Sequence, residues 1–197
     1  MPFYHRTGAA LSSGTRQDSA RNKPSCLTQR WGGCYNPAQQ MDTLAGHDYW
    51  MRVALEQAAI AERLGEVPVG AVAVLDGAVV GAGYNRKESD SDPTAHAEMI
   101  AMREVAARLD NWRLIGVTLY CTLEPCPMCA GAMIQARLSR LVYGAKDTRF
   151  GADGTIVDVL RQPAFNHRVE VVEGVLAEEA GELLQRFFRR LRTAADR

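Results

Sequence analysis

The chain has 197 residues and carries equal numbers of basic and acidic side chains, so its net charge at neutral pH is zero. It is long enough for one well-buried core and too short for two generous domains, and no global field draws it toward nucleic acid or acidic lipid. No apolar run approaches the roughly 20 residues that span a bilayer, so a membrane partner is not expected. Five cysteines are few and odd in number, which argues against a secreted disulfide scaffold and favours a reducing compartment.

The first 40 residues differ in composition from the rest. They contain five Lys or Arg against one Asp, are rich in Ser, Gly, Thr and Gln, and show no sustained apolar period. We expect residues 1–40 to form a disordered extension. A transit peptide is a weaker alternative, and a natural start at Met41 is a third. Residues 41–197 are then expected to fold as a single domain.

Apolar spacing predicts the elements of this domain in turn. A helix is expected over about 47–64, ending at Gly65, which suits a C-terminal cap. Two strands follow, joined at Asp76-Gly77, the strongest short hairpin signal. Further helices are expected over 95–109, from Pro125 to about 137 and, with an apolar stripe facing a sheet, over 180–191; further strands are expected over 116–123, 140–145 and 167–175.

This order of elements predicts the fold class. Strands that alternate with helices after an initial hairpin favour an α/β fold, a three-layer α/β/α sandwich with a mixed five-stranded central sheet. The 116–123 strand is mostly apolar and should be buried on both faces. Cys121 within it is expected to be a core residue, because a free cysteine buries readily.

Two cysteines stand three apart in the segment TLEPCPMCAGAMI. Alone, Cys126 and Cys129 fit a redox pair, half of a structural zinc site or plain packing. A closed zinc site needs two further ligands, and the folded part has no second cysteine pair. His96, in the segment PTAHAEMI, would be a third ligand and leave a fourth position open to water, as in catalytic zinc sites. H-x-E followed by P-C-x-x-C is the signature of zinc deaminases.

The expected local geometry suits this chemistry. Cys126 and Cys129 should lie on one face of a helix near its positive N-terminal end, where both the dipole and a metal favour thiolate over thiol. His96 should stand at the start of another helix, so two helix N-termini would converge on one ion. Glu98 is the only acid tied to the motif that can move protons. Taken singly, a lone histidine or glutamate is more often structural or solvated.

Six segments carry a closer resemblance, which runs from about residue 47 to 192: EVPVGAV, GYNR, DPTAHAEMIAMR, TLYCTLEPCPMCAGAMI, YGAKD and NHRVEVVEGVLAEE. In these the chain resembles the bacterial tRNA-specific adenosine deaminases, the TadA family of the cytidine-deaminase-like superfamily. The resemblance implies a cytidine-deaminase-like fold and a single zinc-dependent deaminase domain over 41–197. It also implies one Zn²⁺ per subunit held by His96, Cys126 and Cys129, and a cytoplasmic homodimer in which both subunits shape the RNA site.

The resemblance further implies hydrolytic deamination of adenosine to inosine at the wobble position of a tRNA anticodon, with the anticodon stem-loop as partner. Glu98 matches the proton shuttle, and zinc-bound hydroxide would attack C6 of the purine. Asn85, in GYNR, matches the family's purine-contacting asparagine, although a turn residue after a strand would look the same. Asp147 matches an acidic position in the substrate-side loop, with a simple turn acid as the alternative.

Two other functions stay open at this point. A deaminase of a free base or nucleotide, of the guanine or cytosine type, would share every zinc residue. A catalytically silent subunit or RNA-binding module with structural zinc is the other, and both Glu98 and the missing fourth ligand count against it. Basic side chains that could contact RNA, or merely form solvated faces, are Lys146, Arg149, Arg186, Arg189, Arg190 and Arg192.

Overall fold

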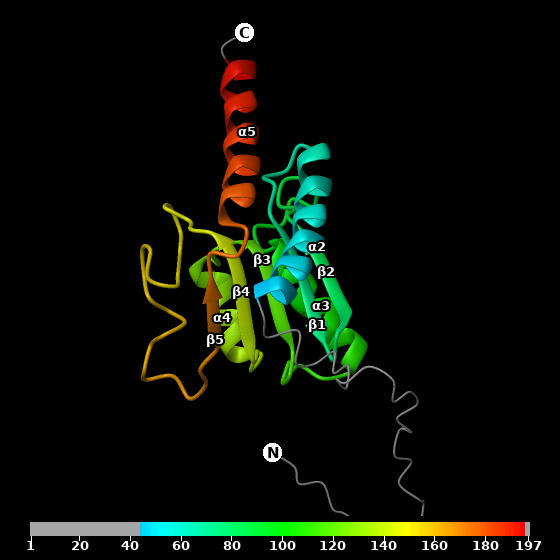
Figure 1. Ribbon diagram of the computed structural model, residues 1–197, viewed down its shortest axis with the longest axis vertical. Helices are drawn as coiled ribbons and strands as arrows, with labels where there is room; N and C mark the ends of the chain where they lie inside the picture. The colour runs from blue at the N-terminus through cyan, green and yellow to red at the C-terminus, as the bar shows by residue number, and fades with distance from the viewer. Residues whose placement is uncertain (1–43, 196–197) are drawn as a thin grey trace, which may run out of the picture. The chain divides into compact units, whose positions relative to one another are not determined.

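The computed structural model describes residues 44–195, which form a mixed sheet with helices on both faces (Figure 1). The expectation for residues 1–40 lies outside the described residues. The elements run in the order α2 (Leu44–Arg63), β1 (Gly70–Leu75), β2 (Ala78–Tyr84), α3 (Ala97–Leu109), β3 (Thr118–Leu123), α4 (Pro127–Gln135), β4 (Arg140–Ala145), β5 (Glu170–Glu173) and α5 (Ala177–Ala195).

The strands lie in the order β2-β1-β3-β4-β5. β1 is antiparallel to both β2 and β3, whereas β3, β4 and β5 are parallel to one another. The predicted mixed five-stranded sheet is therefore confirmed. Because parallel neighbours need crossover connections, α4 links β3 to β4 across one face of the sheet.

Alternate residues of each strand face two different cores. Ala71, Leu119 and Leu141 belong to the core that also contains residues of α3 and α4. Their immediate neighbours in sequence point to the other face, where Val72 and Tyr120 pack with residues of α2. This two-residue period gives the three predicted layers, and it explains why β3 is buried along nearly its whole length.

The hairpin between β1 and β2 forms where the sequence predicts it. Asp76 and Gly77 both have positive φ angles, 50° and 75°, which the two-residue turn of a twisted hairpin requires. Along β2 the helix α3 packs directly on the sheet. A Cβ atom on Gly81 would lie 2.6 Å from the carbonyl oxygen of Ala101, so only glycine allows this close approach.

The start of α4 corrects one prediction. The helix begins at Pro127, and Cys126 before it is extended, with φ −75° and ψ 169°. Pro125 was expected at the first helical position, which was wrong because a residue that precedes proline is driven out of the helical region. Cys126 is consequently the N-cap of α4, and Cys129 lies in its first turn.

The last helix packs mainly on β4 and lies beside α2. Its apolar stripe is buried at Ala180, Leu183 and Phe187, but Leu191 is 50% exposed, so only the first part of the stripe faces the sheet. Arg186 donates to Glu62 of α2, and this hydrogen bond lowers the pKa of Glu62. No helix within residues 44–195 combines the length and the apolar composition needed to cross a membrane.

Candidate active site

Two helix N-termini meet at the candidate site. His96 is the N-cap of α3 and Cys126 is the N-cap of α4, and both have extended backbones. Neither side chain caps its own helix by a hydrogen bond. Both side chains are therefore available for another partner, and the positive ends of two helix dipoles lie near it.

The three predicted ligands lie together. His96 Nδ1 is 3.6 Å from the Sγ atoms of both Cys126 and Cys129, and the three ligand atoms lie within 4.8 Å of one another. A tetrahedral zinc ion with ordinary Zn–N and Zn–S bonds separates such donors by about 3.6 Å. The donor set and its spacing thus fit Zn²⁺. Within the described part of the chain no fourth His, Cys, Asp or Glu joins the group. A tetrahedral ion held by these three ligands would keep one position for solvent.

The thiols are electrostatically coupled. Cys129 donates a hydrogen bond to Cys126, which lowers the pKa of Cys126 to about 4 and raises the pKa of Cys129. The hydrogen bond to Cys126 raises the pKa of His96. The lowered pKa of Cys126 favours its thiolate form, which is the form that a metal binds.

Glu98 lies in the first turn of α3, two residues after His96, and is only 4% exposed. Burial raises the pKa of Glu98, while a hydrogen bond from its own backbone N–H and the neighbouring His96 oppose that shift. A carboxyl group in these surroundings exchanges a proton more readily near neutral pH than an exposed one does.

Asn85 follows β2 and is buried, with its amide donating to Glu66 Oε2 at 3.3 Å. The next backbone N–H, of Arg86, donates to the carbonyl of Ala95, directly before His96. Asn85 is thus joined to the histidine segment through a neighbour, and no hydrogen bond among the described residues joins it to the three ligands directly. Because its amide nitrogen donates to Glu66, the Asn85 carbonyl oxygen is the atom of this side chain that can accept from another group.

Asp147 lies in the loop after β4. Its backbone N–H donates to Glu124 Oε2 at 3.1 Å, and Glu124 stands two residues before Cys126. Its carboxylate accepts from the backbone N–H groups of Arg149 and Phe150. Asp147 therefore has the turn role that was the alternative for it, and it also lies in a loop attached to the cysteine segment.

Glu66 offers a direct test of how the Asn85 loop is held. Its buried carboxylate accepts from Asn85, from the backbone of Glu88 and from the backbone and hydroxyl of Ser89. We expect Glu66→Ala to lower the free energy of unfolding by about 1–3 kcal/mol in urea titrations, because these donors lose their acceptor. Glu88→Ala, at an exposed side chain, is the matched control and should change the free energy of unfolding little. Equal decreases in the free energy of unfolding in both variants would contradict the argument.

The pH dependence of this effect has a definite sign. Hydrogen bonds from Ser89 and Glu88 outweigh burial, so the pKa of Glu66 is lowered. A group with a lowered folded-state pKa stabilises the fold above its unfolded pKa and loses that contribution as pH falls through the folded value. The difference in unfolding free energy between the wild type and Glu66→Ala, measured by urea titration at several pH values, should therefore narrow in acid.

Comparison with known proteins places the chain among deaminases. A model of the MafB19-like deaminase family matches residues 45–192. The tRNA-specific adenosine deaminase of Bacillus subtilis (strain 168) is 47% identical over 145 residues, 74% of this chain and 90% of that protein. That of Haemophilus influenzae (strain Rd) is 51% identical over 143 residues, 72% of this chain and 83% of that protein. The chain belongs to the tRNA-specific adenosine deaminase family.

Solved structures agree with membership of this family. A tRNA A34 deaminase, studied for A-to-I editing at the wobble position of transfer RNA, matches with a TM-score of 0.67 at 43% identity, over 69% of this chain and 99% of that one. A guanine deaminase from Nitrosomonas europaea matches with a TM-score of 0.62 at 25% identity, over 71% of this chain and 83% of that one. The cytidine-deaminase-like sandwich expected for the family is therefore present.

Sequence reasoning missed two buried acids beside the site. Glu66 and Glu124 are each only 1% exposed, and each accepts several hydrogen bonds from a neighbouring loop. A signal was present in both cases, since each acid stands next to a proline-containing apolar segment, in GEVPVG and TLEPC. Charged residues are seldom buried without partners, so an acid in such a segment indicates a hydrogen-bond hub.

Proposed function

We propose that this protein catalyses the hydrolytic deamination of adenosine to inosine at the wobble position of a tRNA anticodon. One observation carries the proposal: a histidine nitrogen and two cysteine sulfurs lie at tetrahedral zinc spacing, and the buried Glu98 lies two residues from that histidine. Family membership supports the substrate, because the relatives compared above are named for adenosine in tRNA. A free-base deaminase is less well supported, since the guanine deaminase is only 25% identical.

His96, Cys126 and Cys129 would hold one Zn²⁺ per subunit. Once bound there, the ion would supply a water molecule acidified enough to act as a nucleophile near neutral pH. The two thiolates would balance the formal charge of the ion. The two helix N-termini favour the ionised form of the cysteines and so support binding.

Glu98 would act as base and then as acid. Its carboxylate would take a proton from the attacking water and deliver it to N1 of the purine, which makes C6 more electrophilic. It would then take the proton of the hydroxyl group now bonded to C6 and pass it to the amino group, which leaves as ammonia as the C6 carbonyl forms. Water and adenosine are thereby converted to inosine and ammonia with no proton gained or lost overall. Burial suits Glu98 to this work because it raises the pKa of the carboxyl group.

The target base must leave the stack of the anticodon loop to reach the cluster, and a single-stranded loop permits this cheaply. We propose that Asn85 contacts the purine through its carbonyl oxygen, since its amide is already bound to Glu66. Asp147 is proposed to lie on the substrate side, in the loop attached to Glu124.

The basic residues of α5 divide into two kinds. Arg186 and Arg190 both donate to Glu62, whereas no acceptor among the described residues is bonded to the guanidinium of Arg189 or Arg192. Lys146 is paired with Glu173. We therefore propose Arg189 and Arg192 as the phosphate contacts of this helix.

Salt dependence of binding tests that assignment. We expect the double variant Arg189→Gln, Arg192→Gln to bind an anticodon stem-loop with a smaller salt dependence. The slope of log Kd against log salt concentration should fall by about 1 to 2, because each phosphate contact that is lost no longer releases a counterion on binding. The matched control is Arg186→Gln, Arg190→Gln, which removes the same charge from the same helix and should leave the slope unchanged. An equal decrease of the slope in both double variants would contradict the assignment, because it would show that the charge of the helix as a whole, and not two particular contacts, attracts the RNA.

We propose a cytoplasmic homodimer whose folded part, residues 41–197, is a single domain. An apolar hollow of about 160 Å³ between α3 and α4 supports a subunit contact there; it is lined by Met99, Met102, Arg103, Ala106, Trp112, Leu114, Ala132 and Ala136. Trp112 beside it is 54% exposed. The tRNA substrate and the free thiols both support the cytoplasm.

The decisive experiment maps inosine in tRNA treated with the purified protein, with and without residues 1–40. Inosine at the wobble position, formed by both proteins, is the expected result. In parallel, guanine, cytosine and their nucleotides are supplied as free substrates and ammonia is measured. Ammonia from one of these without inosine in tRNA would overturn the proposal in favour of a free-base deaminase.

A further inference from the structure

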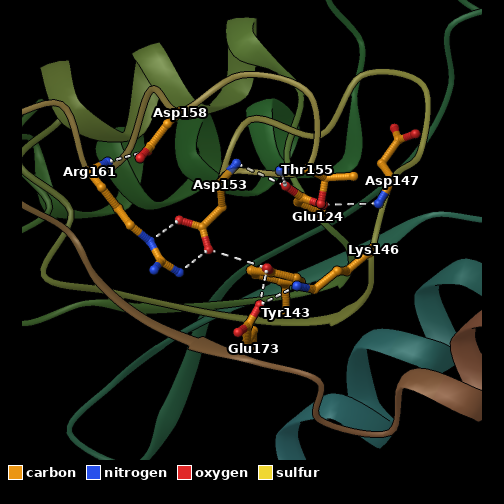
Figure 2. Close-up of polar contacts among 9 residues, drawn as sticks. All are labelled: Glu124, Tyr143, Lys146, Asp147, Asp153, Thr155, Asp158, Arg161 and Glu173. Atoms are coloured by element: carbon orange, nitrogen blue, oxygen red, sulfur yellow. Dashed lines mark hydrogen bonds and ion pairs between the residues drawn. The ribbon is translucent and has the colours of Figure 1, made fainter.

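A second buried carboxylate lies one residue before the cysteine motif and joins two segments of the chain (Figure 2). Glu124 follows β3 directly, is 1% exposed and stands two residues before Cys126. Its Oε1 accepts from the backbone N–H of Asp153 at 2.9 Å and of Thr155 at 3.4 Å. Its Oε2 accepts from the backbone N–H of Asp147 at 3.1 Å and from the Thr155 hydroxyl at 2.6 Å.

Two backbone hydrogen bonds add to these contacts. The N–H of Glu124 donates to the carbonyl of Ala145 at 2.8 Å, and the N–H of Ala152 donates to the carbonyl of Pro125 at 2.9 Å. A Cβ on Gly151 would lie 2.5 Å from Glu124 Oε2, so the loop lies directly against the carboxylate. Residues 147–155 are thus fastened to the residues that immediately precede Cys126.

The Asp153 end of this loop is also held by contacts that do not involve Glu124. Arg161 donates to both oxygens of the buried Asp153 carboxylate, at 3.0 and 2.9 Å. The Tyr143 hydroxyl lies 3.2 Å from Asp153 Oδ2 and 2.9 Å from Glu173 Oε2, within reach to donate to either. Asp153 therefore keeps a second anchor without Glu124, whereas among the described residues the backbone N–H of Asp147 is bonded to Glu124 alone.

The Asp147 end carries groups that suit contact with RNA. The Asp147 carboxylate holds the backbone N–H groups of Arg149 and Phe150, which folds the tip into a tight turn. Phe150 is 64% exposed, and an exposed aromatic ring is a surface on which an unpaired base can stack. The neighbouring Arg149 places its guanidinium 5.6 Å from the centre of the Phe188 ring of α5, so it adds a positive charge near the tip. Figure 2 shows the Asp147 carboxylate turned away from Glu124, with only its backbone nitrogen directed at that residue.

We infer that Glu124 is a positioning residue for the RNA substrate: its carboxylate holds the 147–155 segment at a fixed place beside Cys126, so that the tip meets the nucleotides next to the target base. Glu124 touches neither the substrate nor the metal ligands and acts through Asp147 and the tip. This inference rests on the proposed function and deepens it.

Glu124→Gln tests the inference with a side chain of the same size. An amide keeps one acceptor oxygen and places an NH₂ group against the remaining donors; the Thr155 hydroxyl can reverse and accept, but the Asp147 N–H cannot. We expect KM for an anticodon stem-loop RNA to rise about tenfold, the size of one lost hydrogen bond, with kcat changed less than about threefold. The zinc content should stay that of the wild type.

Hydrogen exchange gives a readout independent of activity. In the Glu124→Gln variant, amide exchange should accelerate in peptides covering 146–156 and stay unchanged in α3 and in the later turns of α4. Thr155→Val, which removes only the shortest bond to Glu124, should show the same pattern with a smaller rise in KM. Tyr143→Phe is the control, because it removes a hydroxyl from the far side of Asp153 and leaves the four bonds to Glu124 intact.

The outcomes separate the alternatives. A KM within twofold of the wild type, or a fall in kcat with KM unchanged, would overturn the inference, since either result limits Glu124 to supporting the fold or the cysteines. If Glu124→Gln does not fold, Thr155→Val decides on the same criteria. If the wild type forms no inosine, the proposed function fails, whereas RNA affinity and amide exchange still decide whether Glu124 positions the loop.

Discussion

Glu98→Gln should slow inosine formation by about 10²- to 10⁴-fold, the usual range for loss of a general acid–base group. Glutamine has the same shape, so it fits the buried position in the first turn of α3. It cannot take a proton from water, and the proposed mechanism uses Glu98 at two proton transfers. The measurement is single-turnover formation of inosine in an anticodon stem-loop, together with metal analysis of the same preparation.

The zinc content separates this result from a damaged site. Because Glu98 is outside the three-ligand group, the Glu98→Gln protein should bind as much zinc as the wild type. Glu104→Gln is the matched control, since Glu104 is an exposed acid later in α3 whose carboxylate accepts only from the backbone of β2. Activity of Glu98→Gln within tenfold of the wild type would remove Glu98 from the chemistry.

Cys129→Ser is expected to remove both zinc and activity. A hydroxyl is a poor replacement for a thiolate ligand, and the remaining His96 and Cys126 cannot hold the ion alone. In the wild type, zinc at about 100 times its Kd would stabilise the fold by about 2.7 kcal/mol. Chelation should therefore lower the melting temperature of the wild type by about 5–10 °C and leave that of the variant unchanged.

A second cysteine provides the control for that experiment. Cys121 is buried in β3, and among the described residues it is outside the group of His96, Cys126 and Cys129. Cys121→Ala loses one thiol, as Cys129→Ser does, but should keep zinc and its sensitivity to chelators. A Cys129→Ser protein that retains stoichiometric zinc would contradict the proposed ligand set.

The sequence predicts the elements well because their signals are local. The positive φ angles at Asp76 and Gly77 and the buried strand around Tyr120 follow from residues adjacent in the chain. Even the misplaced start of α4 had a local signal, since Pro127 excludes the helical region for Cys126. No local signal marks the exposed end of α5. Leu191 continues the regular apolar stripe of the helix, although the helix has passed the edge of the buried core by that point.

Tertiary structure decided which polar groups meet. Arg189 and Arg190 are neighbours with the same side chain, yet Arg190 donates to Glu62, 128 residues away in the chain. Glu124 finds its donors 23 to 31 residues later, in a loop of irregular structure. Such partners depend on how loops return to the sheet, and no periodicity in the sequence records that path.

By itself, then, the sequence determined the donor types for a metal, the acid beside them and the alternation of helices and strands, because ligand chemistry and burial are properties of single residues and of short spacings. Only the folded chain set the 3.6 Å separation between His96 Nδ1 and the two sulfurs. Only the folded chain, too, placed the carboxylates of Glu66 and Glu124 where each accepts several hydrogen bonds from a neighbouring loop. The physical reason is that a buried carboxylate must find donors, and their identity depends on which backbone N–H groups the packed sheet brings within reach.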